Sequence, residues 1–215
     1  EGTRSRAIAQ LRLLSVPPSA GFWVDGFRGS IDGDDGAEGR LVILLEGSAD
    51  VLERATRDLR SGLGRAGVPE THVLDRGARE SFERVVDAYV ACVGERSITY
   101  RLASEPDAER SVLALRALAE RFALRVDTIV DAMNGDAVAR ISDLDAHALG
   151  SKIEMFDDAL HDAEPRAIVI AGNHPKRGRL RVWGELPPAF DAMRGLKARF
   201  DPNGTLNHGR FVGGL

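Results

Sequence analysis

The sequence predicts an α+β fold in which an antiparallel or mixed sheet carries helices packed on one face. Short apolar or alternating segments typical of strands are interspersed with longer segments whose apolar residues recur at helical spacing. The later strands are joined by a tight turn, which favours antiparallel neighbours. A weak repeat, in which LVILLEGS and SITYRLAS each precede an amphipathic helix, fits a doubled ferredoxin-like layout. The other face of such a sheet would be free to cover something.

The first part of the chain predicts three strands and one helix. Residues 11–18 (LRLLSVPP) have the pattern of a strand stopped by two prolines, and GFWVDGF follows as a second short strand. An acidic, glycine-rich loop covers residues 28–40, and the continuous apolar run of residues 41–47 predicts a buried strand. Ser48 is placed to cap the next helix. The apolar face of that helix consists of Val51, Leu52, Ala55 and Leu59.

The middle of the chain predicts two helices around an alternating strand. Residues 71–75 form a short strand or an extended link, and residues 77–93 have the apolar spacing of a helix. SITYRLA (97–103) alternates as a strand does. Residues 104–107 then combine a capping serine, an early proline and two acids, which favour a helix start. The buried stripe of this helix is Val112, Leu115, Ala119 and Phe122.

A hairpin is predicted where Asn134-Gly135 interrupts RVDTIVDAM and DAVARIS, as a two-residue turn with positive φ at both residues. A helix follows from about 145 to 162, with an apolar face of Leu149, Ile153, Phe156 and Leu160. Residues 166–172 (RAIVIAG) predict another strand, for which residues 178–184 (GRLRVWG) are a candidate partner. Two prolines then open a last amphipathic helix that uses Phe190, Met193, Leu196 and Phe200.

Composition excludes several classes of protein. The 215 residues suffice for one large domain or two small ones, and a net charge of −4 gives no positive field for nucleic acid. Cys92 is the one cysteine, so no intrachain disulfide is possible, and its apolar neighbours predict a buried, inert thiol. No apolar run is long enough for a membrane span. We therefore expect a cytoplasmic protein. The first residue is not Met, which indicates a processed, truncated or recombinant chain.

Familiar motifs occur in the wrong context. GLGRAG (62–67) matches a dinucleotide loop, but it follows a helix, so we expect it to end that helix. DGDDG (32–36) lacks the later ligands of a calcium loop and reads as a solvated acidic loop. The five histidines have no metal-ligand spacing, and His147 and His161 fall near the solvent side of their predicted helix. His174 lies in a basic segment (GNHPKRG) that is either an anion site or, as we favour, a plain basic loop.

The C-terminal segment has definite turn chemistry and carries a family resemblance. In RFDPNGTLNHGRF (199–211), proline sets φ and Gly204 admits the left-handed conformation. LKARFDPNGTLNHGRFVGGL (196–215) resembles the C-terminal signature of FAD-linked oxidases of the vanillyl-alcohol oxidase type, above all the FAD-binding subunit of glycolate oxidase. His208 stands where that family has proline. EGT at residues 1–3 and LRLLSVPP (11–18) resemble the family segment that leads into the cap, although residues 4–6 depart from it. SITYRLASEPDA also resembles a cap strand followed by its helix.

The resemblance implies a division of the chain. Residues 1–18 would be the end of an FAD-binding domain whose remainder is missing, 19–199 the cap or substrate domain, and 200–215 a strap that returns to the FAD-binding domain. FAD would be bound mainly by the absent domain, with contacts from Thr3, Asn207 and Arg210. The substrate would be a small 2-hydroxy acid such as glycolate. No histidine-rich GDGNxH-like segment occurs, so we expect no metal.

Substrate binding needs a cation for the carboxylate, and arginine suits it by bidentate geometry. Arg101, Arg140 and Arg181 are on predicted strands, and the sequence does not choose among them. Catalytic residues stay unassigned. The partners implied are the FAD-binding domain and other oxidase subunits. We expect the full-length protein to be an FAD-dependent oxidoreductase and this chain alone to be inactive. The alternative is a stand-alone, non-enzymatic α+β module for binding or subunit contact that lacks the flavin domain.

Overall fold

The computed structural model describes residues 2–27, 39–68, 70–74, 77–90, 96–103, 108–143, 148–174 and 176–215. Within them, six strands form one sheet in the order β2-β1-β4-β5-β3-β6, and every neighbouring pair is antiparallel. The α+β class and the antiparallel sheet are confirmed. The strands are β1 (Ala20–Asp25), β2 (Arg40–Leu44), β3 (Ile98–Ala103), β4 (Leu124–Asp131), β5 (Asp136–Asp143) and β6 (Ile168–Gly172).

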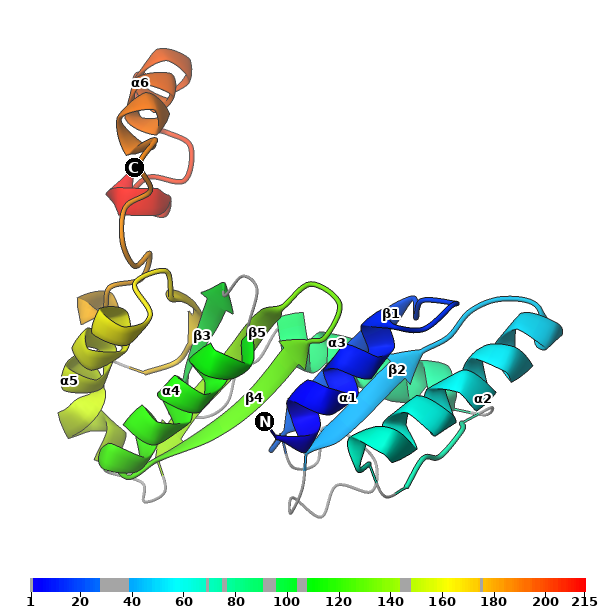
Figure 1. The fold of residues 1–215 in the computed structure, drawn as a ribbon. Coiled ribbons are helices and arrows are strands. Elements are labelled where there is room, and N and C mark those ends of the chain that lie inside the picture. The colour runs from blue at the N-terminus through cyan, green and yellow to red at the C-terminus, as the bar shows by residue number, and fades with distance from the viewer. Residues whose placement is uncertain are drawn as a thin grey trace.

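Helices lie on both faces of this sheet. Figure 1 shows α1, α2, α4 and α5 side by side on one face, called the first face here, with α3 behind the sheet on the second face. The sequence predicts helices on a single face of the sheet, and α3 departs from that prediction because it covers the opposite face. The helices are α1 (Thr3–Arg12), α2 (Ala49–Ala66), α3 (Ala78–Val90), α4 (Ala108–Arg121), α5 (Ala148–Ala163) and α6 (Phe190–Phe200), with short 3-10 turns η1 (Arg177–Arg179) and η2 (Val212–Gly214).

The second half of the chain has the ferredoxin-like arrangement. The order β3-α4-β4-β5-α5-β6 gives neighbouring strands β4-β5-β3-β6, because each crossover skips one strand position that another strand then fills. Strands β1 and β2 extend this unit at the edge of β4. The described residues therefore contain one ferredoxin-like unit with a two-stranded extension.

The main hydrophobic core lies between the first face and its four helices. Within α4 and α5, the predicted stripe residues whose side chains the structure describes are buried, including Leu115, Phe156 and Leu160, all with no exposed surface. The side chains of Ile98, Tyr100 and Leu102 on β3 point into the same core. Burial of each such side chain stabilises the fold by about 1.5–3 kcal/mol, which makes this layer the main source of stability.

A smaller core lies under α3 on the second face. Val85 of α3 is fully buried, and the ring of Phe22 on β1 lies 5.8 Å from Phe82 and 5.3 Å from Tyr89. This core involves β1, β4 and β5. The rest of that face, toward β3 and β6, carries Arg101, Arg140, Ile168 and Ile170, and Ile170 packs against the edge of this core; we call these four residues the open half of the second face.

Residues 11–18 were predicted as a strand, and this prediction is wrong. Residues 3–12 form helix α1, which packs beside α2, and it buries Ala7 and Leu11 one turn apart. Arg4 of the same helix pairs with Asp25 of β1 at 3.2 Å. The apolar residues of this segment recur at helical spacing, and the two prolines follow the helix end, where they are common.

Two further local predictions need correction. The hairpin of β4 and β5 is confirmed, but its loop spans residues 132–135 and only Gly135 has positive φ. The Asp131 carboxylate accepts the backbone N–H groups of Met133 and Asn134 at 2.9 and 3.0 Å, which stabilises this longer turn. Strand β2 is half-buried at the sheet edge, not buried, since it pairs with β1 alone among the described strands.

The GLGRAG segment ends a helix, as predicted. Gly62 and Gly64 lie in the last turns of α2, and Gly67 ends it in the left-handed conformation (φ 86°). The N–H groups of Gly67 and Val68 donate to carbonyl groups of the last turn, which is the usual way that a glycine closes a helix.

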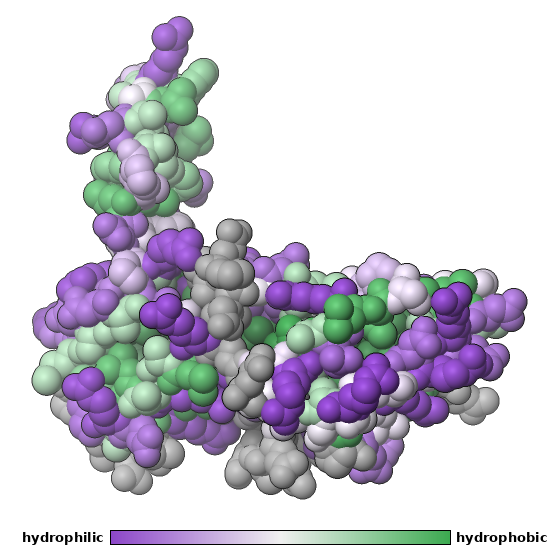
Figure 2. Space-filling view, in the orientation of Figure 1, coloured by the Kyte–Doolittle hydropathy of each residue, from purple (hydrophilic) through white to green (hydrophobic). Residues whose placement is uncertain are grey.

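Helix α6 and the residues after it stand away from the sheet (Figure 1). We call residues 190–215 the C-terminal arm. Helix α6 buries none of its residues, and Leu196 and Phe200 are 57% and 76% exposed. Figure 2 shows hydrophobic residues gathered on the surface of this arm. The last helix is confirmed; Phe190 of its apolar stripe is half-buried against Gly213, while Leu196 and Phe200 of the same stripe stay exposed.

Candidate functional site

Arg101 and Arg140 lie on the same face of the sheet. On β3 and β5, Thr99 pairs with Arg140 and Arg101 pairs with Val138, so the two arginines are diagonal neighbours on the second face. Arg101 forms an ion pair with Asp136, and this contact raises the pKa of the guanidinium. The open half of the second face thus brings two of the three candidate substrate arginines together.

Arg140 belongs to a charge cluster around the buried Asp127 that sequence reasoning missed. Its Nε and Nη2 atoms donate to Asp127 Oδ2 at 3.1 and 2.6 Å, and Arg125 Nε donates to Asp127 Oδ1 at 3.0 Å. The guanidinium of Arg140 also lies 4.5 Å from the ring centre of Phe27. Alternation along β4 puts Arg125 and Asp127 on one face, and that signal could have found the cluster.

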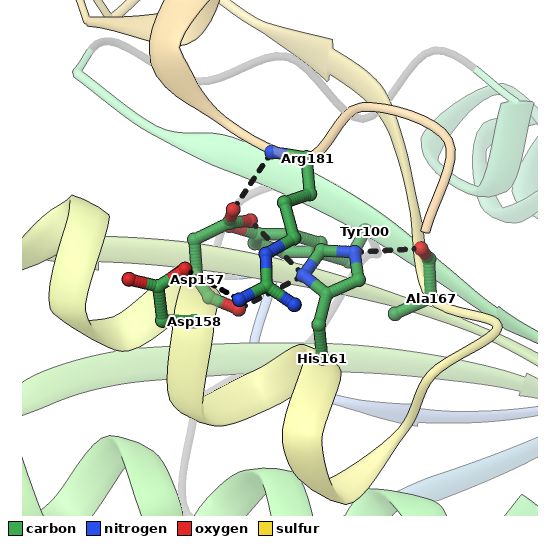
Figure 3. A network of polar contacts seen from close by, with 6 residues as sticks. All are labelled: Tyr100, Asp157, Asp158, His161, Ala167 and Arg181. Atoms are coloured by element: carbon green, nitrogen blue, oxygen red, sulfur yellow. Dashed lines mark hydrogen bonds and ion pairs between the residues drawn. The ribbon is translucent and has the colours of Figure 1, made fainter. Parts of the chain in front are cut away.

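Arg181 lies elsewhere, beside α5. Its backbone N–H donates to Asp157 Oδ2 at 2.8 Å, and its side chain pairs with Asp158 at 2.9 Å (Figure 3). It sits in the segment after η1, and not on one of the strands. The segment 178–184 does make one strand-like contact, in which Val169 N–H donates to Val182 O at 2.8 Å.

A buried polar network connects β3, α5 and the segment after β6 (Figure 3). The Tyr100 hydroxyl donates to Asp157 Oδ1 at 2.9 Å. His161, predicted near solvent, is only 4% exposed, and its Nδ1 and Nε2 lie 2.8 and 3.0 Å from the carbonyl oxygens of Asp157 and Ala167. Burial, together with Asp157, raises the pKa of Tyr100 well above its ordinary value. Its buried members, Tyr100, Asp157 and His161, are 0%, 2% and 4% exposed and belong to the core, while the Arg181–Asp158 pair at its edge is exposed.

The C-terminal arm carries the segment that resembles the FAD-linked oxidases. The Asp201 carboxylate accepts the N–H groups of Thr205 and Leu206 at 2.8 and 2.9 Å, the Thr205 hydroxyl at 3.0 Å, and Lys197 Nζ at 2.5 Å. These contacts, the one from Lys197 first, hold the pKa of Asp201 far below its ordinary 3.8. The loop is therefore organised by its own residues, without a partner.

The three candidate cofactor contacts do not come together. Asn207 has φ 50°, and its carbonyl oxygen accepts the N–H of Arg210 at 2.9 Å, so both lie in one exposed turn of the arm. Thr3 begins α1, where its hydroxyl accepts a hydrogen bond from Arg6 at 3.3 Å. The start of α1 and the arm lie in different parts of the molecule (Figure 1).

The basic segment around His174 is internally neutralised in part. Lys176 and Arg179 both pair with Glu154 of α5 at 3.4 Å.

Cys92, residues 32–36 and His147 lie outside the described residues. In the part of the chain that the structure describes, no group of three or more His, Cys, Asp or Glu side chains could hold a metal ion. No described helix is both long and apolar enough to cross a membrane.

No family model matches the chain, and no curated protein matches it. The candidate site therefore has to be judged from its geometry. It consists of an open sheet surface with two arginines, and of an arm that presents a preorganised loop and exposed apolar residues.

Proposed function

We propose that this chain is the cap portion of an FAD-linked oxidoreductase that oxidises a small 2-hydroxy acid such as glycolate. The observation that carries the proposal is the C-terminal arm. Four contacts to Asp201 shape its loop, while Leu196, Phe200 and Leu206 stay more than half exposed. A loop with ordered polar contacts beside unburied apolar residues is suited to seat against a second folded unit. That unit, in our proposal, is the FAD-binding domain.

The described residues fit a flavin in two respects. The exposed turn of Asn207 and Arg210 offers an amide and a cation, which suit polar groups of the cofactor. The open half of the second face offers half-buried Ile168 and Ile170 beside Arg101 and Arg140. FAD, when bound, supplies the hydride acceptor for the oxidation. The residues of this chain would position the substrate, exclude water and hold the arm in place.

Arg140 of the open half of the second face would bind the substrate carboxylate, with Arg101 beside it. Guanidinium groups recognise carboxylates by two parallel hydrogen bonds, which also orient the carbon that loses its hydride. Arg181 is far less suited to this role, because it pairs with Asp158 beside α5, away from the other two arginines. We place the protein in the cytoplasm, in keeping with the single cysteine of this chain.

The experiment that tests this proposal compares the isolated chain with the native protein. A tag on this chain in its source cells allows purification of whatever polypeptide or complex contains it, followed by its visible spectrum and its flavin content. We expect a flavin in the native protein and a colourless isolated chain. Tightly bound flavin on the isolated chain would mean that the division into cap and FAD-binding domain is wrong.

The exposed arm favours a second candidate function as well. A module that contacts another subunit without any enzymatic role would also leave Leu196 and Phe200 unburied on its own. The same purification separates the two. A native complex that contains partner chains but no flavin would support the subunit-contact module and reject the oxidoreductase.

A further inference from the structure

Asp127 is one carboxylate shared by two arginines. Arg125 donates to its Oδ1 at 3.0 Å and Arg140 to its Oδ2 at 2.6 Å. Arg101 and Arg181 differ, because each has an acidic partner of its own, Asp136 and Asp158. The cluster of Arg125, Asp127 and Arg140 therefore carries one positive charge that no described acid balances, on the second face of the sheet.

Buried residues hold the cluster on its side toward the protein interior. Asp127 is 2% exposed and Phe27, under the Arg140 guanidinium, is 1% exposed. Gly26 approaches so closely that a Cβ there would lie 2.1 Å from Asp127 Oδ1. The buried carboxylate and the ring therefore fix the orientation of both arginines before any ligand arrives, which lowers the cost of binding.

Within the part of the chain that the structure describes, both arginines keep donors that make no hydrogen bond. Arg140 donates to Asp127 through Nε and Nη2, and Arg125 through Nε alone, which leaves Nη1 of Arg140 and both terminal nitrogens of Arg125. Their side chains are 20% and 37% exposed, so a ligand can reach them. Two oriented guanidinium groups with one net charge are suited to a planar, singly charged oxyanion.

We propose that Arg125 and Arg140, positioned by Asp127, form a binding site for the carboxylate of one small organic acid. The site deepens the proposed function, on which the further assignment of this acid as a 2-hydroxy acid rests. Arg140 and Arg125 then hold the carboxylate, and Asp127 is a positioning residue that does not touch the ligand. Arg101 contributes to the rim of the surface through its pair with Asp136.

The test is an NMR titration of the chain, at low salt, with glycolate, acetate and inorganic phosphate, read on the arginine Nε–Hε resonances. We expect glycolate to shift Arg125 and Arg140 saturably and to leave Arg181 unchanged. Arg140→Lys and Arg125→Lys keep the charge but lose the fork, so each should weaken binding about tenfold. Arg181→Lys is the matched control and should leave the affinity unchanged. Arg125→Lys is informative even where Arg140→Lys unfolds the chain, since Arg125 makes a single hydrogen bond through its side chain within the described structure.

Three results would decide against parts of this inference. If none of the anions shifts Arg125 and Arg140 saturably, or if Arg181→Lys weakens binding as much as the other variants, the site is rejected. If phosphate binds more than tenfold tighter than both carboxylates, the carboxylate assignment is rejected. If acetate binds as tightly as glycolate and the lysine variants weaken both, the carboxylate site is supported, while the 2-hydroxy acid of the proposed function loses its support.

Discussion

The hydroxyl of Tyr100 donates a hydrogen bond to Asp157 Oδ1 at 2.9 Å, between two side chains that are both almost fully buried. One residue comes from β3 and the other from α5. The same carboxylate accepts the backbone N–H of Arg181, which ties the segment after η1 to the core. This carboxylate therefore connects the sheet, a first-face helix and the segment that leads toward the C-terminal arm.

Tyr100→Phe should lower the free energy of unfolding by about 1–3 kcal/mol, because it leaves a buried carboxylate oxygen without its hydroxyl donor. Chemical denaturation monitored by circular dichroism measures this change. Tyr89→Phe is the matched control, because Tyr89 is half-buried and its hydroxyl makes no hydrogen bond in the described structure. The free energy of unfolding of this variant should be close to that of the unchanged chain. Equal losses in the two variants would show that the bond to Asp157 contributes nothing specific.

The two tyrosines should also resist ionisation at high pH. Burial raises the pKa of Tyr89 to about 12 and that of Tyr100 further. Between the ordinary value of 10.0 and these values, the unfolded chain loses protons that the folded chain retains, so the free energy of unfolding should fall as the pH rises through this range. Below pH 10.0 the tyrosines should have no effect. A spectrophotometric titration of tyrosinate that gives a midpoint near 10.0 in the folded protein would contradict this prediction.

Gly26→Ala should destabilise the charge cluster on the second face. Its φ is 80°, which a side chain rarely adopts, and the new Cβ would meet Asp127 Oδ1 at 2.1 Å. We expect the free energy of unfolding to fall by about 1–3 kcal/mol and the NMR resonances of the Arg125 and Arg140 side chains to shift. Gly195→Ala in α6 is the control: nothing lies within 4 Å of its Cβ, and alanine favours a helix by about 1 kcal/mol. A neutral Gly26→Ala variant would show that Asp127 is not held in place.

The C-terminal arm should keep its shape in mild acid. The contacts from Lys197 and from the Leu206 N–H lower the pKa of Asp201, so its stabilising effect is complete above 3.8 and is lost only as the pH falls through the lowered value. We expect the Asp201 carboxyl carbon to show the ionised chemical shift at pH 3.8. Asp191, on the exposed surface of the same arm, serves as the internal comparison. A midpoint near 3.8 for Asp201 would mean that the loop is not organised as described.

The sequence predicted helices correctly where a helix buries a single apolar stripe in one hydrophobic core. The spacing in residues 108–121 and 148–163 correctly predicted α4 and α5, because both helices bury a single continuous stripe. The strand prediction for residues 11–18 was wrong, because LRLLSVPP also has the pattern of a strand that ends at prolines. The helix is instead indicated by Ala7 and Leu11, which lie one helical turn apart and are both buried.

Other features depend on contacts that spacing cannot reveal. Periodicity predicted α3, but it does not indicate which face of a sheet a helix covers. The smaller core under α3 could therefore not be predicted from the sequence. The turn around Asn134 is longer than the dipeptide predicted, because the Asp131 side chain stabilises it. The candidate arginines could be listed from the sequence, but their acidic partners, which separate Arg140 from Arg101 and Arg181, come from strands and helices distant in the chain.

The central claim is that this chain completes the active site of an FAD-linked oxidoreductase. The most direct measurement is the visible absorption of the native protein that contains this chain, recorded without oxygen before and after glycolate or another small 2-hydroxy acid is added. We expect the oxidised flavin band to be present and to bleach, and Arg140→Lys to slow the bleaching. A native protein without flavin absorption, or with a flavin that no 2-hydroxy acid bleaches, would contradict this account.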